Sequence, residues 1–121
     1  ILLHQRRLWL IDHGSSLYFH HSPAWYGEDV TLKRARTPFP PIRNHALLRF
    51  AGSLREVDAL LKPLLYPDLI ASTVALLPDS WLLDAVDPAV LRAGYRLWLN
   101  ERLAASHVFV DEAENARAHL L

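Results

Sequence analysis

Apolar residues recur at helical spacing through the second half of the chain, and this pattern most limits the folds open to it. The clearest helix is expected from Asp87-Pro88 to about Ala105, because Leu91, Tyr95 and Trp98 fall on one stripe. Asp followed by Pro is typical of a helix start, since the carboxylate caps amides and proline needs no partner there. The pattern predicts a mainly α protein.

Further helices are expected on both sides of this one. Ser53 to Glu56 reads as a capping box, and the helix that it opens carries an apolar stripe until Pro63 ends or kinks it. The stripe consists of Leu54, Val57, Leu60 and Leu61. The other expected helices run from Asn44 to Phe50, from Pro67 to Pro78, from Ser80 to Val86 with Asp79 as cap, and from Val108 to Leu121. Residues 45–121 are therefore predicted to form a helical subdomain of about five or six helices.

The first 22 residues favour a β-hairpin followed by a turn. Two short apolar runs, Ile1 to Leu3 and Leu8 to Ile11, flank a polar break at Gln5-Arg6-Arg7. Leu17 to His21 is either a further strand or irregular. Because a two-stranded hairpin is not stable alone, we expect it to pack on the helices or on strands from another part of a longer protein.

Residues 23–44 are expected to form a long proline-rich loop that joins the hairpin to the helices. The segment holds four of the eight prolines and no sustained periodicity, and Pro40-Pro41 is expected to exclude a helix there. The three parts, 1–22, 23–44 and 45–121, are predicted to form one domain.

The composition limits the partners. Lysines and arginines number 13, as do aspartates and glutamates, so the formal net charge is zero and no overall basic field favours nucleic acid or an anionic membrane. Cysteine is absent, which excludes disulfides and thiol chemistry. Methionine is also absent and the first residue is Ile1, so we expect the chain to be part of a longer protein. With no secretory signal and no apolar run near membrane length, we expect a cytoplasmic location.

Asp12-His13-Gly14 is the sharpest chemical feature. A carboxylate placed directly after an apolar strand suits Mg²⁺, which takes one or two carboxylates together with substrate phosphates, and Gly14 allows a tight turn. The alternative is that Asp12 caps a turn through its own backbone, and spacing alone favours this alternative.

Other candidate residues are weaker. Lys33, Arg34 and Arg36 could receive a phosphate or an acidic substrate, although a short basic run is more often a solvated face. His20-His21 would point to opposite faces of a strand and so are a poor metal pair. The four tryptophans are expected to be core or interface anchors. They are Trp9, Trp25, Trp81 and Trp98.

The run from Leu8 to His21 resembles a segment of HipA-like kinases, in particular an uncharacterised bacterial group. Pro38 to His45 and the helical remainder resemble that group too, so the likeness covers most of the chain. A strand followed by Ile-Asp-x-Gly is also similar to the metal-binding segment of protein-kinase-like folds, with His13 in place of the aromatic residue. The resemblance implies that the chain is the helical C-lobe of such a fold.

The resemblance also implies roles for the residues. Asp12 would bind the Mg²⁺ that bridges the ATP phosphates, with His13 and Gly14 as neighbours of the phosphate site. Lys33, Arg34 and Arg36 would be phosphate or substrate contacts. The catalytic loop would lie just before Ile1, because no Asp or Asn occurs between Ile1 and Ile11. The intact protein would be a phosphotransferase, and these 121 residues alone would be inactive.

Two alternatives from other classes remain. The chain could be a non-catalytic helical interaction module, in which Asp12 is only a turn residue, or part of a pseudokinase that binds nucleotide without turnover. In each case the expected partners are the remainder of the same protein and a protein substrate or partner. Apolar surface left uncovered would favour self-association of the 121 residues.

Overall fold

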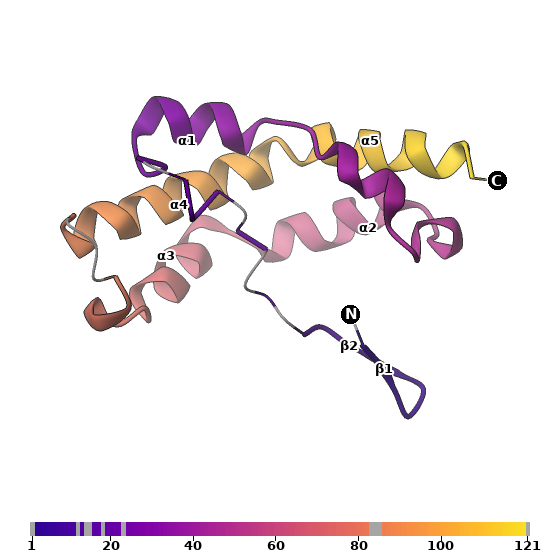
Figure 1. The fold of residues 1–121 in the computed structure, drawn as a ribbon, viewed down its shortest axis with the longest axis horizontal. Coiled ribbons are helices and arrows are strands. Elements are labelled where there is room, and N and C mark those ends of the chain that lie inside the picture. Colours follow the sequence, from indigo (N-terminus) through magenta and orange to yellow (C-terminus); the bar gives the residue numbers. More distant parts are fainter. Residues whose placement is uncertain are drawn as a thin grey trace.

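Two consecutive helices, α4 (Pro88–Ala104) and α5 (Ser106–Ala118), run along most of the length of the molecule (Figure 1). This computed structural model describes residues 2–11, 13, 16–17, 19–22, 24–82 and 86–120. The predicted start of α4 is confirmed: Asp87 accepts a hydrogen bond from the Ala89 amide at 2.8 Å, and Pro88 takes the first turn. Ala105 separates the two helices. The last helix was expected from Val108 to Leu121, and it begins two residues earlier, at Ser106, and ends at Ala118.

The main core lies on α4. Helices α1 (Glu28–Ala35) and α3 (Pro67–Ala75) pack on opposite sides of it (Figure 1). Their contacts bury a cluster rich in aromatic residues. It contains Phe19, Trp25, Ala35, Ile70, Val74, Leu82, Leu91, Tyr95 and Trp98. Most of the burial in the molecule is therefore concentrated on one half of the long helical pair.

Helix α1 corrects the prediction that residues 23–44 form a loop. Its first turn carries Glu28 and Asp29 and its last turn Lys33 and Arg34, which is the favourable order for the helix dipole. Thr31 and Ala35, four residues apart, are its buried face. A helix of eight residues between two proline-containing stretches leaves too little periodicity to detect by pattern alone.

Pro40-Pro41 also corrects the sequence prediction. The prolines begin a 3₁₀ helix, η2 (Pro40–Asn44), because a first turn needs no amide donor from them. A second 3₁₀ helix, η3 (Leu48–Phe50), follows, so the single helix expected from Asn44 to Phe50 is replaced by two short turns. Both contact α5.

Helix α2 (Leu54–Leu61) packs against α5 and continues into the 3₁₀ helix η4 (Lys62–Leu64), which contains Pro63. The Ser53 cap is confirmed, since its hydroxyl accepts from the Glu56 amide at 3.2 Å.

Helix α3 begins at Pro67 as expected and is followed by η5 (Asp79–Trp81). Asp79 is not a cap; its carboxylate pairs with Arg92 at 2.5 Å.

The N-terminal hairpin has two strands of three residues, β1 (Leu2–His4) and β2 (Arg7–Trp9), which pair antiparallel with Leu2 opposite Trp9. The turn residues Gln5 and Arg6 have φ values of 49° and 61°, a left-handed conformation that non-glycine residues adopt at a cost. The hairpin extends away from the helices (Figure 1). The described residues of 16–22 are turns and not a third strand.

Among the helices of the described residues, none combines the length and the apolar character that crossing a membrane requires.

Candidate functional site

Asp12-His13-Gly14 begins three residues after the hairpin, since β2 ends at Trp9 and does not extend to Ile11 as expected. Asp12 and Gly14 lie outside the described residues, so the predicted metal ligand has no geometry to report. His13 is exposed, and its carbonyl accepts from the Ser16 amide at 2.9 Å. Within the described residues, no three His, Asp or Glu side chains come together as a metal site. The role of this segment stays a prediction.

The residues that follow are held on α4 by aromatic contacts. Phe19 is 1% exposed and packs 4.3 Å from Trp98 between ring centroids. His20 stacks on Tyr95 with the rings 15° apart, and its Nδ1 shares a short hydrogen bond with the Tyr95 hydroxyl. His20 and His21 meet edge to face at 5.1 Å, so they do not point to opposite faces as expected for a strand.

Trp25 and Tyr26 lie across α4 at Gly94. A Cβ at Gly94 would come within 3.0 Å of the Tyr26 Cβ and 3.1 Å of the Trp25 ring, so the absence of a side chain permits this approach. Thr31, fully buried in α1, donates to the Trp25 carbonyl at 2.7 Å. These contacts fix the segment just beyond the candidate metal turn.

The predicted phosphate contacts fall on α1 and its C-terminal end. Lys33 is exposed and Arg34 is half-buried. Arg36 forms an ion pair with Glu101 of α4 at 2.7 Å, which engages its guanidinium. The residues are near one another in sequence but only Arg36 has an acidic partner among the described ion pairs. Their predicted role in binding phosphate is not tested by this arrangement.

Two of the four tryptophans are core anchors, as predicted. Trp25 and Trp98 are buried in the cluster on α4, whereas Trp9 and Trp81 are exposed. Trp9 belongs to the projecting hairpin and Trp81 to η5. These two rings are not part of the core in this structure.

The feature that sequence reasoning missed is an apolar groove of about 500 Å³ between α2, α5 and the turns η2 and η3. Five of its apolar side chains are exposed, between 38% and 52%, and we call them the groove face. They are Phe39, Leu47, Val57, Leu61 and Leu65. The stripe on α2 was recognised in the sequence. No local signal shows that part of it lines an open groove, because the opposite wall comes from α5.

A polar cluster borders this groove, with Ser106 buried and Asp58 and Lys62 half-buried. Ser106, 1% exposed at the start of α5, donates to the Asp58 carboxylate at 3.0 Å and lies 3.2 Å from the Lys62 ammonium. Lys62 also donates to the Ala104 carbonyl. The cluster therefore joins α2 to the α4–α5 junction.

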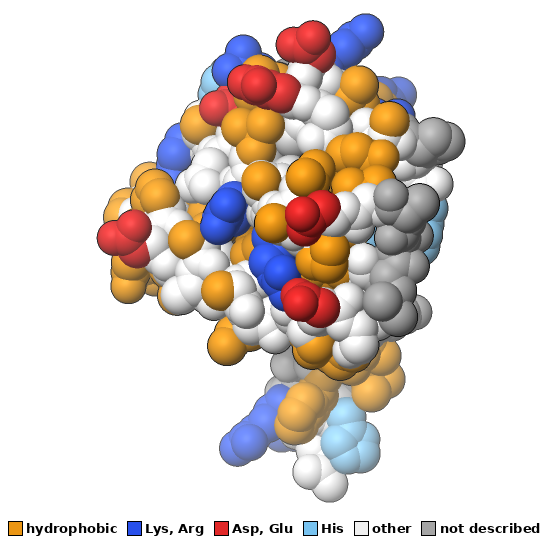
Figure 2. All heavy atoms as spheres, turned by 90° about the vertical axis from the view of Figure 1, so that its left-hand side faces the viewer, with side chains coloured by type: hydrophobic (Ala, Val, Ile, Leu, Met, Phe, Trp, Pro, Cys, Tyr) orange, Lys and Arg blue, Asp and Glu red, His pale blue; other side chains and the backbone are white. Residues whose placement is uncertain are grey.

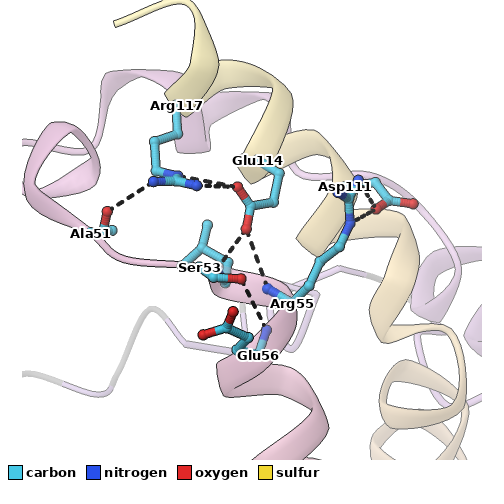
Figure 3. A network of polar contacts seen from close by, with 8 residues as sticks. Ala51, Ser53, Arg55, Glu56, Asp111, Glu114 and Arg117 are labelled. Carbon is cyan, nitrogen blue, oxygen red and sulfur yellow. Dashed lines mark hydrogen bonds and ion pairs between the residues drawn. The ribbon is translucent and has the colours of Figure 1, made fainter. Parts of the chain in front are cut away.

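The N-terminus of α2 is held by a carboxylate from α5 (Figure 3). Glu114 accepts from the Leu54 amide at 2.6 Å and from the Arg55 amide at 3.3 Å, while its other oxygen accepts from Arg117. Arg117 also donates to the Ala51 carbonyl. The hydrogen bond from Arg117 is the main reason that the pKa of Glu114 is lowered, and the two amides lower it further, against the opposing effect of desolvation. The network is structural: it satisfies amides that a helix start leaves without partners.

Comparisons with known proteins give no relative. No family model matches the chain, and neither curated proteins nor solved structures show a significant match.

Proposed function

We propose that this chain is the helical C-terminal part of a cytoplasmic HipA-like kinase, and that the intact protein transfers a phosphoryl group from ATP. Asp12 is the proposed Mg²⁺ ligand, with His13 and Gly14 beside the phosphates. The observation that carries the proposal is the strand β2, which ends three residues before Asp12, in the order that the Ile-Asp-x-Gly resemblance requires. The mainly helical body after it is compatible with a kinase C-lobe.

The proposed chemistry assigns a limited part to these residues. Mg²⁺, when bound, neutralises charge on the ATP phosphates during transfer. Asp12 would hold the ion three residues after the last residue of β2, and Phe19 and His20 tie the following segment to α4. The proposal puts the catalytic base and the nucleotide-pairing lysine upstream of Ile1, so the 121 residues alone are expected to transfer no phosphate.

The direct test is Asp12→Asn in a longer protein that contains this sequence. Phosphoryl transfer from Mg²⁺–ATP is expected to fall by about 100-fold or more, because the loss of one charge-stabilising group in a site has effects of this order. Asp68→Asn is the matched control, since Asp68 is an exposed acid in the first turn of α3. Unchanged transfer by Asp12→Asn would remove Asp12 from the mechanism, and Mg²⁺-dependent nucleotide binding without turnover in the parent would indicate a pseudokinase.

The second candidate is a non-catalytic interaction module, and the apolar groove is the observation that favours it. Lining by apolar side chains with a few polar groups at one border is typical of a surface that binds a partner. A parent protein that neither binds nor hydrolyses nucleotide, with Asp12→Asn indistinguishable from the unmodified chain, would support the module over the kinase.

A further inference from the structure

We propose that the free edge of strand β2 binds an extended, acidic segment of a partner protein, which adds a third strand to the N-terminal hairpin. Within the described residues the sheet has two strands, β1 and β2. Each strand therefore has one edge without a neighbour in this part of the chain. A sheet edge of this kind offers a row of backbone donors and acceptors to an incoming strand.

The geometry of the turn decides which backbone groups face this edge. Gln5 and Arg6 both have left-handed φ values, as in the two-residue turn that joins closely paired strands. The residues that flank such a turn, His4 and Arg7, exchange backbone hydrogen bonds, and pairs of this type alternate along the ladder with pairs that do not. Leu8 therefore directs its amide and its carbonyl away from β1, towards the free edge of β2.

The side chains beside this edge are exposed. Arg7 and Trp9 lie on one face of β2, and Leu8 lies on the other. Trp9 is 50% exposed and Leu8 is 66% exposed, so an added strand would cover apolar surface on both faces of the hairpin. A strand that pairs with Leu8 places one side chain beside Arg7 and another beside Trp9. The edge thus has one charged position and one aromatic position.

The charge of the hairpin selects an acidic segment. Residues 1–11 contain Arg6 and Arg7 and no Asp or Glu, so their side chains carry two formal positive charges. Neither arginine forms an ion pair among the described residues. Figure 2 shows the hairpin at the lower end of the molecule, with basic and apolar side chains and, on the visible side, no acidic one. An acid beside Arg7 forms a favourable cross-strand pair, whereas a base there is repelled.

The same charge argues against a second copy as the occupant. Pairing of β2 with β2 of another copy would bring the two arginines of each hairpin together, and neither β1 nor β2 carries an acid to offset them. Nucleic acid would match the positive charge, but its backbone has no amides and carbonyls at strand spacing to pair with Leu8. An acidic strand satisfies both the charge and the edge.

The register defines the partner segment further. In an antiparallel strand, the residue opposite Trp9 comes first, then the residue opposite Leu8, and then the residue opposite Arg7. The position beside Trp9 favours a β-branched or aromatic residue, because such cross-strand pairs stabilise a sheet. The expected order in the partner is therefore a β-branched or aromatic residue, any residue, and an acid.

Titration of the isotope-labelled 121-residue chain with a synthetic peptide, followed by nuclear magnetic resonance, tests the proposal. The probe is Thr-Thr-Val-Thr-Glu-Thr-Thr with blocked ends, and the control peptide has lysine in place of glutamate. The probe is expected to shift the amide signal of Leu8 with a Kd between about 10 μM and 1 mM. The lysine peptide is expected to bind at least about fivefold more weakly.

Two proline variants locate the edge. Leu8→Pro removes the amide that faces out from β2 and is expected to weaken binding of the probe by at least about fivefold. Leu3→Pro, at the position paired with Leu8, removes the outward amide of β1 and is expected to leave the Kd unchanged. Cross-strand contacts between His4 and Arg7 in the spectra establish that each variant keeps its hairpin.

A charge reversal tests the acidic position. Arg7→Glu is expected to reverse the preference between the two peptides. Arg96→Glu is the matched control, since Arg96 is an exposed arginine of α4, and it is expected to leave the preference unchanged. Circular dichroism establishes that both variants keep their helices.

Four results would overturn the proposal. The first is no shift of the Leu8 signal with the glutamate peptide at millimolar concentration. The second is equal binding of the two peptides, or binding that Leu8→Pro leaves unchanged while Leu3→Pro keeps its hairpin. The third is a shift of the Leu8 signal with protein concentration alone, which would indicate pairing between hairpins. The fourth is tighter binding of a single-stranded oligonucleotide that survives Leu8→Pro, which would assign the arginines to phosphate.

Discussion

Gly94 is the position at which the packing of the Trp25–Tyr26 segment can be tested most directly. In an isolated helix, Gly94→Ala would stabilise by about 1 kcal/mol, because glycine is the poorer helix former. In this structure the new methyl group would lie 3.0 Å from the Tyr26 Cβ and 3.1 Å from the Tyr26 Cα. Overpacking of this kind costs about 1–3 kcal/mol. The two effects oppose each other, so the sign depends on whether the segment can move.

The contacts around Trp25 resist such movement. Its carbonyl is held by the buried Thr31 hydroxyl, and its ring is 4% exposed and 4.5 Å from the Tyr95 ring centroid. One of the close neighbours of the added methyl is backbone, which cannot rotate away as a side-chain end can. We therefore expect overpacking to prevail, with a net loss of about 1 kcal/mol and a fall in Tm of roughly 3–6 °C.

Urea unfolding followed by far-ultraviolet circular dichroism gives the free energy of unfolding. Ala93→Gly provides the scale, because Ala93 is the exposed neighbour in the same helix and its replacement should cost about 1 kcal/mol through helix propensity alone. If Gly94→Ala instead gains as much stability as Ala93→Gly loses, the segment does not sit tightly on α4, and the reasoning fails.

Two further variants probe the helix starts. Glu114→Gln should lower the free energy of unfolding more at neutral than at acidic pH. The pKa of Glu114 is lowered in the folded chain, so its carboxylate stabilises the fold fully above the pKa that Glu114 has in the unfolded chain. This stabilisation is lost as the pH falls through the pKa of Glu114 in the folded chain. Denaturation across that pH range checks this, with exposed Glu56→Gln as control, and a loss independent of pH would contradict it. Asp87→Ala should cost about 1 kcal/mol by removing the α4 cap. Asp68→Ala, which removes a first-turn charge but no cap, should cost less, and equal losses in thermal melts would argue against the cap.

Local signals predicted three of the helix starts, but the expected cap at Asp79 was wrong. Ser53, Pro67 and Asp87-Pro88 all act where the sequence indicated, because capping depends on residues within one turn of each other. Helix α1 was missed because its stability comes from packing on α4 and not from a long periodic stripe. The hairpin was expected, yet its turn uses left-handed Gln5 and Arg6, for which residue type gave no indication.

The candidate site could be predicted only in part. Asp12 is identified by its position after a strand and by resemblance, and its geometry lies outside the described residues. The groove could not be predicted, because it requires α2 to face α5 although more than forty residues of sequence separate the two helices. The Glu114 cap of α2 depends on the same long-range pairing. Contacts between residues far apart in the sequence produce no pattern among neighbouring residues.

The break between α4 and α5 at Ala105 has a consequence for the order in which the molecule unfolds. The large aromatic cluster belongs to α4, whereas the buried residues of α5 are the smaller Ser106, Val110 and Ala113. Cooperative unfolding units tend to follow such divisions in packing density. The C-terminal helix and α2 would thus melt as the weaker unit, and damage to their shared surface would leave the aromatic half folded.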